Sequence, residues 1–95
     1  MNLDELPGSE LILPGLEDLR NGNSDTVGAL LVAIASTRLT NAGLNFPKAH
    51  LMPEPELTLY NHLQREREDA YPHYNALLDS LNSFCNALEL SRARS

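Results

Sequence analysis

Apolar residues recur at alternating steps of three and four along the C-terminal third of the chain. This is the heptad pattern, which keeps one stripe of an α-helix facing a partner surface. The pattern predicts a long C-terminal helix over residues 53–91. We call its stripe the heptad seam; it consists of Tyr60, Leu63, Arg67, Ala70, Tyr74, Leu77, Leu81, Phe84 and Leu88.

Pro72 interrupts this helical pattern. A proline inside a helix removes a backbone hydrogen bond and costs about 3 kcal/mol, so Pro72 either bends one helix or separates two. The heptad phase passes through Pro72 without a slip, and no glycine or cluster of turn residues precedes it. The sequence therefore favours one long helix that is bent near Pro72, with two separate helices as the alternative.

The middle of the chain predicts a central helix over residues 24–43. Its residues are apolar around most of the circumference, which is typical of a helix that is buried on several sides. Ser24 or Asp25 is the expected N-cap. Gly43 followed by Leu44 predicts a Schellman ending for this helix.

The N-terminal part shows a weaker pattern. Residues 1–13 have no helical period and are expected to form an extended arm. Pro14 is tolerated in the first turn of a helix and Gly22 is a natural stop, so they delimit a short helix over residues 14–22. Gly28, inside the central helix, suits a close approach of another helix.

The lengths of these helices bear on assembly. The long C-terminal helix would span roughly 54 Å, whereas the central helix would span roughly 26 Å. The shorter helices therefore leave part of the heptad seam in water, and monomers seldom expose such a patch. The sequence predicts an all-α helical bundle that is completed by a homodimer, with a seam buried inside one chain as the alternative.

Arg67 is the charged residue within the heptad seam. A charged residue at such a position typically fixes the register of two helices or the number of chains. Alternatively, the seam is exposed at Arg67, with Glu68 or Asp69 as its neighbour. The sequence leaves both interpretations open.

The chain has 95 residues and a net charge of −6. This length fits a single domain. The basic residues Arg20, Arg38 and Lys48 stand alone along the sequence, so we expect no nucleic-acid partner. The longest apolar run, residues 27–35, falls short of the roughly 20 residues that span a membrane, and no membrane partner is expected.

Catalysis and export are not expected either. The single cysteine, Cys85, cannot form an intramolecular disulfide, and the opening MNLDELPGSE lacks the basic start of a secretion signal, which predicts a cytoplasmic protein. Cys85 lies beside Phe84 and is expected to be a buried packing residue. No histidine lies at helical distance from the thiol, so the chain is predicted not to be an enzyme and to need no cofactor.

Two histidines and two acidic residues are spaced by four, three and four positions in the predicted long helix. On a continuous helix they project within a sector of roughly 60°. Such a group suits Zn²⁺ when a second chain or helix adds ligands, and the alternative is a solvated polar flank. The candidate metal ligands are His62, Glu66, Asp69 and His73.

Residues 74–84 resemble small bacterial helical proteins without assigned function, and the resemblance implies no activity. The sequence predicts a non-enzymatic interaction or regulatory module that forms a homodimer through the heptad seam and has an acidic exterior for a protein partner. Two alternatives stand beside it. One is a metal-binding or metal-sensing protein that uses the four candidate ligands, and the other is an acidic antitoxin-like inhibitor of a basic partner.

Overall fold

The computed structural model describes residues 3–48, 51–66 and 68–93. Over these ranges it is helical and contains no strand, which confirms the all-α class. None of the helices in this part of the chain is both long enough and apolar enough to cross a membrane. The elements are η1 (Leu3–Glu5), α1 (Ser9–Arg20), α2 (Val27–Ile34), α3 (Ser36–Asn41), α4 (Pro55–Glu66) and α5 (Ala70–Ala93).

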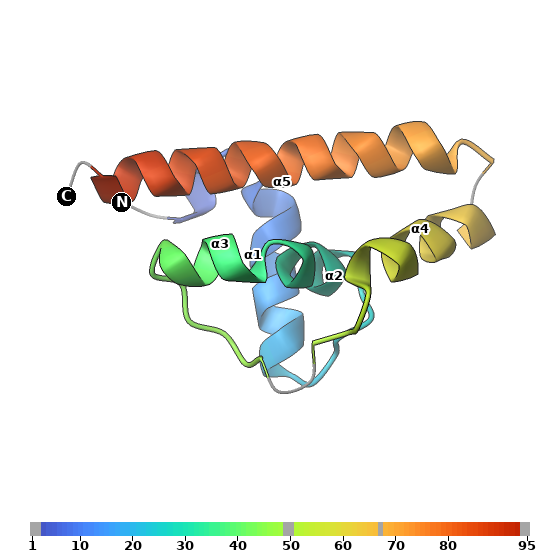
Figure 1. Cartoon of the computed structure of the whole chain (residues 1–95), viewed down its shortest axis with the longest axis horizontal. Helices are drawn as coiled ribbons and strands as arrows, with labels where there is room; N and C mark the ends of the chain where they lie inside the picture. Colours follow the sequence, from blue (N-terminus) through green and yellow to red (C-terminus); the bar gives the residue numbers. More distant parts are fainter. Residues whose placement is uncertain (1–2, 49–50, 67, 94–95) are drawn as a thin grey trace.

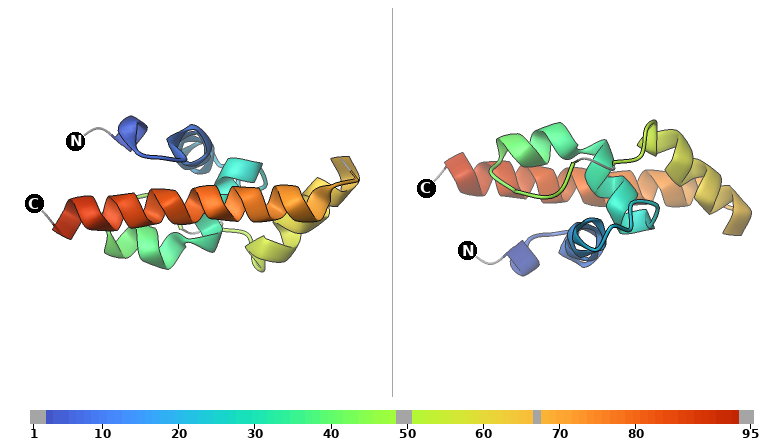
Figure 2. Two further views of the ribbon diagram at one scale, coloured as in Figure 1. Left: turned by 90° about the horizontal axis from the view of Figure 1, so that it is seen from above. Right: turned by 90° about the horizontal axis from the view of Figure 1, so that it is seen from below.

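The longest helix, α5, lies along one side of the molecule and the shorter helices pack beneath it (Figure 1). α1 crosses at a steep angle to α5, so that it is seen almost end-on from above and below (Figure 2). In those views α1 lies to one side of α5, α3 and the beginning of α4 lie to the other, and α4 crosses α5 near the hairpin turn. The core forms between these layers.

The prediction of a single long helix over residues 53–91 is wrong. α4 ends at Glu66, and α5 begins at Ala70 after a turn at Glu68 and Asp69. The chain doubles back at this turn, so that α5 packs against α4 as a helical hairpin (Figure 1). The alternative of two separate helices is the one observed.

Pro72 explains why the break costs little. It lies in the first turn of α5, where a backbone N–H has no partner within the helix, so the proline loses no helical hydrogen bond. The N–H of His73 donates to the carbonyl of Asp69 at 3.3 Å. The first turn of α5 therefore starts from an aspartate, a residue favoured at helix N-termini.

The bounds predicted for the N-terminal part are also wrong. In place of an extended arm over residues 1–13 and a helix over 14–22, the chain forms η1 and then α1, which begins at Ser9. Pro14 lies inside α1 and is exposed, so the buried face of the helix is undisturbed. That face continues across Pro14 at steps of four and three, and consists of Ile12, Leu16 and Leu19.

The central helix predicted over residues 24–43 is divided in two. Ala35 separates α2 from α3, with φ −102° and ψ 20°. Ser36 and Thr37 follow directly; their hydroxyls compete for backbone hydrogen bonds, which weakens the preference for a continuous helix.

The N-cap of α2 is Thr26, not Ser24 or Asp25 as predicted. The Thr26 hydroxyl oxygen accepts a hydrogen bond from the Ala29 N–H at 3.1 Å. The same hydroxyl donates to the Asp18 carboxylate at 2.7 Å, which ties the start of α2 to α1. Because both hydrogen bonds use the Thr26 hydroxyl, this side chain caps α2 and also fixes the start of α2 against α1.

The Schellman ending predicted at Gly43 is confirmed. Gly43 has φ 98°, a left-handed conformation that suits glycine. The Leu44 N–H donates to the Leu39 carbonyl at 3.0 Å, and the Gly43 N–H donates to the Thr40 carbonyl at 3.0 Å. These are the two hydrogen bonds that define the motif.

The described residues of the heptad seam belong to the core of the single chain or pack against it. Tyr60 and Tyr74 are half-buried. Arg67 lies outside the described residues, so its role in register stays a prediction. The seam residues that are at most 6 % exposed are Leu63, Ala70, Leu77, Leu81, Phe84 and Leu88. The hairpin and the other helices cover the stripe, so the exposed patch that led to the homodimer prediction is not present; the homodimer itself stays a prediction.

Two glycines let α1 and α2 cross in close contact. A Cβ atom on Gly28 would lie 2.8 Å from both the Cα and the N of Gly15, and also 2.8 Å from the carbonyl oxygen of Leu11. Backbone atoms cannot move aside as a flexible side chain can. The close approach expected at Gly28 is therefore confirmed, and α1 packs mainly against α2.

Candidate functional site

The three tyrosines of the chain meet at the α4–α5 hairpin. The ring of Tyr60 on α4 packs edge-to-face with Tyr71 (centroids 6.5 Å apart) and with Tyr74 (5.4 Å), both on α5. Edge-to-face packing is a favoured arrangement of aromatic rings. We call these three residues the tyrosine cluster; it exists because the turn at residues 68–69 brings α5 back beside α4 (Figure 1).

Part of this region faces solvent. Tyr71 is 62 % exposed, and Leu57, one helical turn before Tyr60, is 55 % exposed. They are two of the three exposed large hydrophobic side chains in the described ranges; the third, Leu90, lies near the far end of α5. We call Leu57 together with the tyrosine cluster the tyrosine surface. It combines one exposed aromatic and one exposed aliphatic side chain with two half-buried rings.

The electrostatic setting of the tyrosine surface is negative. Burial raises the pKa of the Tyr74 phenol above its ordinary value, and the charge of Glu56 adds to this effect. Glu56 lies in the first turn of α4, one helical turn before Tyr60. The exposed acidic residues of the hairpin and its approach are Glu54, Glu56, Glu66, Glu68 and Asp69.

The four candidate metal ligands do not share one helix. His62 and Glu66 lie on α4, Asp69 lies in the turn, and His73 lies on α5. The predicted arrangement on one face is wrong, because it assumed that the helix continued through residues 67–69. No group of three or more histidine, cysteine, aspartate or glutamate side chains is placed to hold a metal ion anywhere in the described ranges.

A second polar cluster joins α3 to α5. Arg38, which stood alone in the sequence, contacts the Glu89 carboxylate through two nitrogens, at 2.7 and 3.1 Å. It also donates to the side-chain oxygens of Asn86 at 2.9 Å and Asn82 at 3.3 Å. The hydrogen bond from Arg38 lowers the pKa of Glu89. Because all of these acceptors lie on α5, Arg38 links α3 to α5.

Cys85 packs in the core, as predicted. It is 1 % exposed, and burial raises the pKa of its thiol, although the charge of Arg38 partly opposes this effect. A thiol with a raised pKa stays protonated at neutral pH, whereas a reactive cysteine needs a lowered one.

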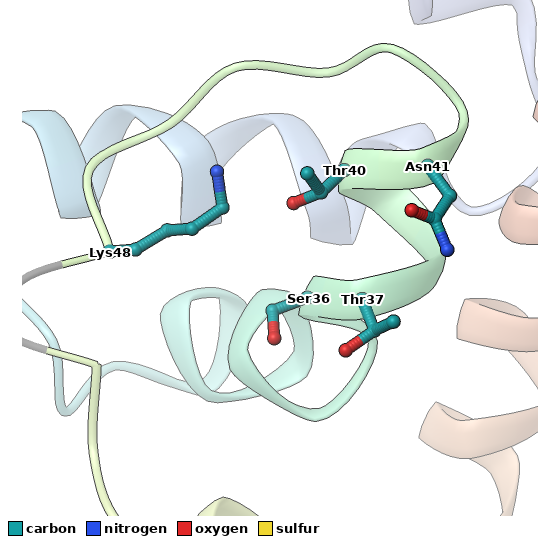
Figure 3. Close-up of a pocket in the computed structure, with 5 residues that line it drawn as sticks. All are labelled: Ser36, Thr37, Thr40, Asn41 and Lys48. Carbon is teal, nitrogen blue, oxygen red and sulfur yellow. The ribbon is translucent and has the colours of Figure 1, made fainter.

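A small recess lies between α3 and the loop that follows it (Figure 3). Its volume is about 250 Å³, and the Lys48 ammonium and the Thr40 hydroxyl face the space between loop and helix. Lys48 also lies over the ring of Phe46, 4.7 Å from its centroid. Ligand pockets are usually larger, from about 300 Å³, and mostly apolar. The recess is lined by Ser36, Thr37, Thr40, Asn41 and Lys48, which are polar and mostly exposed.

Comparison with protein-family models, with curated proteins and with solved structures finds no match to this chain. Within the described residues, the tyrosine surface combines exposure, aromatic character and nearby acidic side chains.

Proposed function

We propose that this protein is a non-enzymatic module that binds another protein through the tyrosine surface of the α4–α5 hairpin. The observation that carries the proposal is the exposure of Tyr71 and Leu57 beside rings that already pack together. Tyrosine offers a large, rigid contact area and a hydroxyl that forms hydrogen bonds, which is why it is enriched where proteins meet.

Burial favours this surface over the fully buried part of the heptad seam as the place of contact. Leu81 and Phe84 are at most 3 % exposed within one chain, so a partner reaches them only if the fold opens. Tyr71 and Leu57 expose more than half of their surface. Full burial of a large apolar side chain is worth about 1.5–3 kcal/mol. Covering Tyr71 and Leu57 with a partner would therefore contribute favourably to the free energy of binding.

The tyrosine cluster is also held in place before a partner arrives. Leu59 and Leu63, on either side of Tyr60 in α4, are at most 2 % exposed and anchor that helix. Ala70 and Leu77 anchor the start of α5 in the same way. Side chains that are ordered in the free protein lose less conformational entropy on binding.

Site-specific photo-crosslinking in the cells that make this protein tests the proposal. A photoreactive phenylalanine analogue replaces Leu57 in one variant and Asn23, exposed in the loop between α1 and α2, in the control. We expect a discrete protein adduct from position 57 and none from position 23. We also expect Tyr71→Ser to remove the adduct. The absence of an adduct at position 57, or equal adducts at both positions, contradicts the proposal.

A further inference from the structure

We infer that the partner presents a cationic segment, with an arginine or lysine side chain that lies against the tyrosine cluster beside Glu56. This inference rests on the proposed function and specifies the chemistry of the partner at the same surface.

The first support is charge complementarity. Five acidic residues are exposed between positions 54 and 69, whereas Arg65 is the exposed basic residue that the structure describes there. The chain as a whole has a net charge of −6. Interfaces place positive potential against negative, and like charges brought together select against the wrong partner.

The second support is the pairing of an aromatic face with a carboxylate. A cation over an aromatic ring is attracted to the negative face of the ring. Tyr71 is exposed enough to accept such a contact, and Glu56 lies on α4 one helical turn before Tyr60, on the same face of the helix. A guanidinium or ammonium group at this place can form a cation–π contact with Tyr71 and an ion pair with Glu56.

Two cations of this chain are engaged away from the hairpin. Lys48 lies over Phe46, and Arg38 is bound to Glu89. In the described ranges, the cation–ring contact is that of Lys48 with Phe46, which is remote in sequence from the hairpin. Within the described residues, no arginine or lysine lies over a ring of the tyrosine cluster.

The same charges argue against other occupants. A second copy of this chain would bring one acidic hairpin against another, and an anionic lipid surface would be repelled in the same way. Both remain outcomes of the experiments. An adduct at position 57 that contains two copies of this chain overturns the cationic partner but not the proposed function.

Tyrosine fluorescence measures binding at this place directly. The chain has no tryptophan, so its emission comes from three tyrosines, and all three lie in the tyrosine cluster. The probe is a blocked peptide of alternating arginine and glycine, which does not fluoresce. We expect a saturable change in emission at low salt, and none with the matching glutamate–glycine peptide. No change with the arginine peptide overturns the inference.

Matched variants separate a specific contact from general attraction to an acidic protein. Glu56→Gln removes one charge beside the tyrosine cluster, and Glu5→Gln removes one from η1, near the other end of α5 (Figure 2). We expect Glu56→Gln to weaken binding about fivefold and Glu5→Gln to change it less than about twofold. Equal effects of the two variants overturn the inference.

The exposed ring supplies a second comparison. Tyr71→Ser removes the aromatic face and is expected to weaken binding about fivefold. Tyr71→Phe keeps the face and is expected to bind within about twofold of the original protein. Far-UV circular dichroism verifies that each variant is folded. If Tyr71→Ser binds the peptide as well as Tyr71→Phe, the ring is not the contact. An adduct at position 57 without peptide binding would then leave the proposed function standing with a partner of other chemistry.

Discussion

Arg38 on α3 and Glu89 on α5 are joined by a two-point contact, with nitrogen–oxygen distances of 2.7 and 3.1 Å. The two residues are far apart in sequence, and both are partly exposed. Asn82 and Asn86 accept further hydrogen bonds from the same guanidinium. The contact fixes α3 against the C-terminal half of α5, and the hairpin turn fixes α4 against the N-terminal part of α5.

Arg38→Gln is expected to raise the pKa of Glu89 toward its ordinary value. Arg38 donates to the charged form of the carboxyl and so favours ionisation. Because the folded pKa lies below the unfolded one, the stabilisation is present at neutral pH and is lost as the pH falls through the lowered pKa of Glu89. An NMR titration of the glutamate carboxyl carbons measures the change. Arg20→Gln, which removes the exposed pair with Glu17, is the control; an equal titration of Glu89 in the original protein and Arg38→Gln contradicts the contact.

Gly28→Ala is expected to lower the free energy of unfolding by about 3 kcal/mol, the upper end of the usual cost of overpacking. The added Cβ would press on the backbone of Gly15, which cannot yield without separating α1 from α2. Gly22→Ala is the control, since it meets no atom within 4 Å and carries only the cost of its left-handed conformation. Urea denaturation gives both values. A loss at Gly28 no larger than that at Gly22 would argue against the close crossing.

The Tyr74 phenol is expected to ionise at a higher pH than free tyrosine. Burial is the main cause and the charge of Glu56 is the lesser one. Glu56→Gln should therefore lower the pKa of Tyr74 in part but not fully. Since the folded pKa is raised, the linked stabilisation is complete below the ordinary phenol pKa and is lost as the pH rises through the folded one. Absorbance of tyrosinate near 295 nm follows the titration; a Glu56→Gln curve identical to the original would show that the two groups do not interact.

Leu81→Ala is expected to lower the free energy of unfolding by about 3 kcal/mol, as for other buried leucines. If the heptad seam is the core of one chain, the urea midpoints of the original protein and of the variant do not depend on protein concentration. If the seam joins two chains, dilution lowers both midpoints. Denaturation at two concentrations, tenfold or more apart, separates these cases.

Local signals in the sequence were sufficient to predict a helix end where a single residue determines the backbone conformation. Gly43 followed by Leu44 specified the end of α3, because glycine adopts the left-handed conformation that a Schellman ending needs. The helical period also defined the all-α class. Pro14 misled the prediction for α1, although Ile12 and Leu16 lie on one face on either side of it.

The turn between α4 and α5 was missed for a physical reason. Heptad phase reports which residues share a stripe, and a hairpin keeps both halves of the stripe facing the same core. The continuous phase therefore did not distinguish one helix from two. The available signal was Asp69 three residues before Pro72, since an aspartate N-cap with a proline in the first turn marks a helix start.

The tyrosine cluster was not predictable without that turn. Tyr60 and Tyr74 were both assigned to the heptad seam, but Tyr71 was not, and no local pattern places Tyr71 beside Tyr60. Their contact depends on the direction in which α5 leaves the turn, which is set by packing against α1 and α2.

The nuclear Overhauser effect between the rings of Tyr60 and Tyr74 tests most directly the chain reversal on which the tyrosine surface depends. The structure predicts cross-peaks between the ring protons of the two residues, since their centroids are 5.4 Å apart. In one continuous helix the two residues would be separated by about 21 Å along the axis. Clear cross-peaks support the hairpin and its exposed tyrosine surface. Their absence, with each ring in contact only with residues one helical turn away, would contradict both.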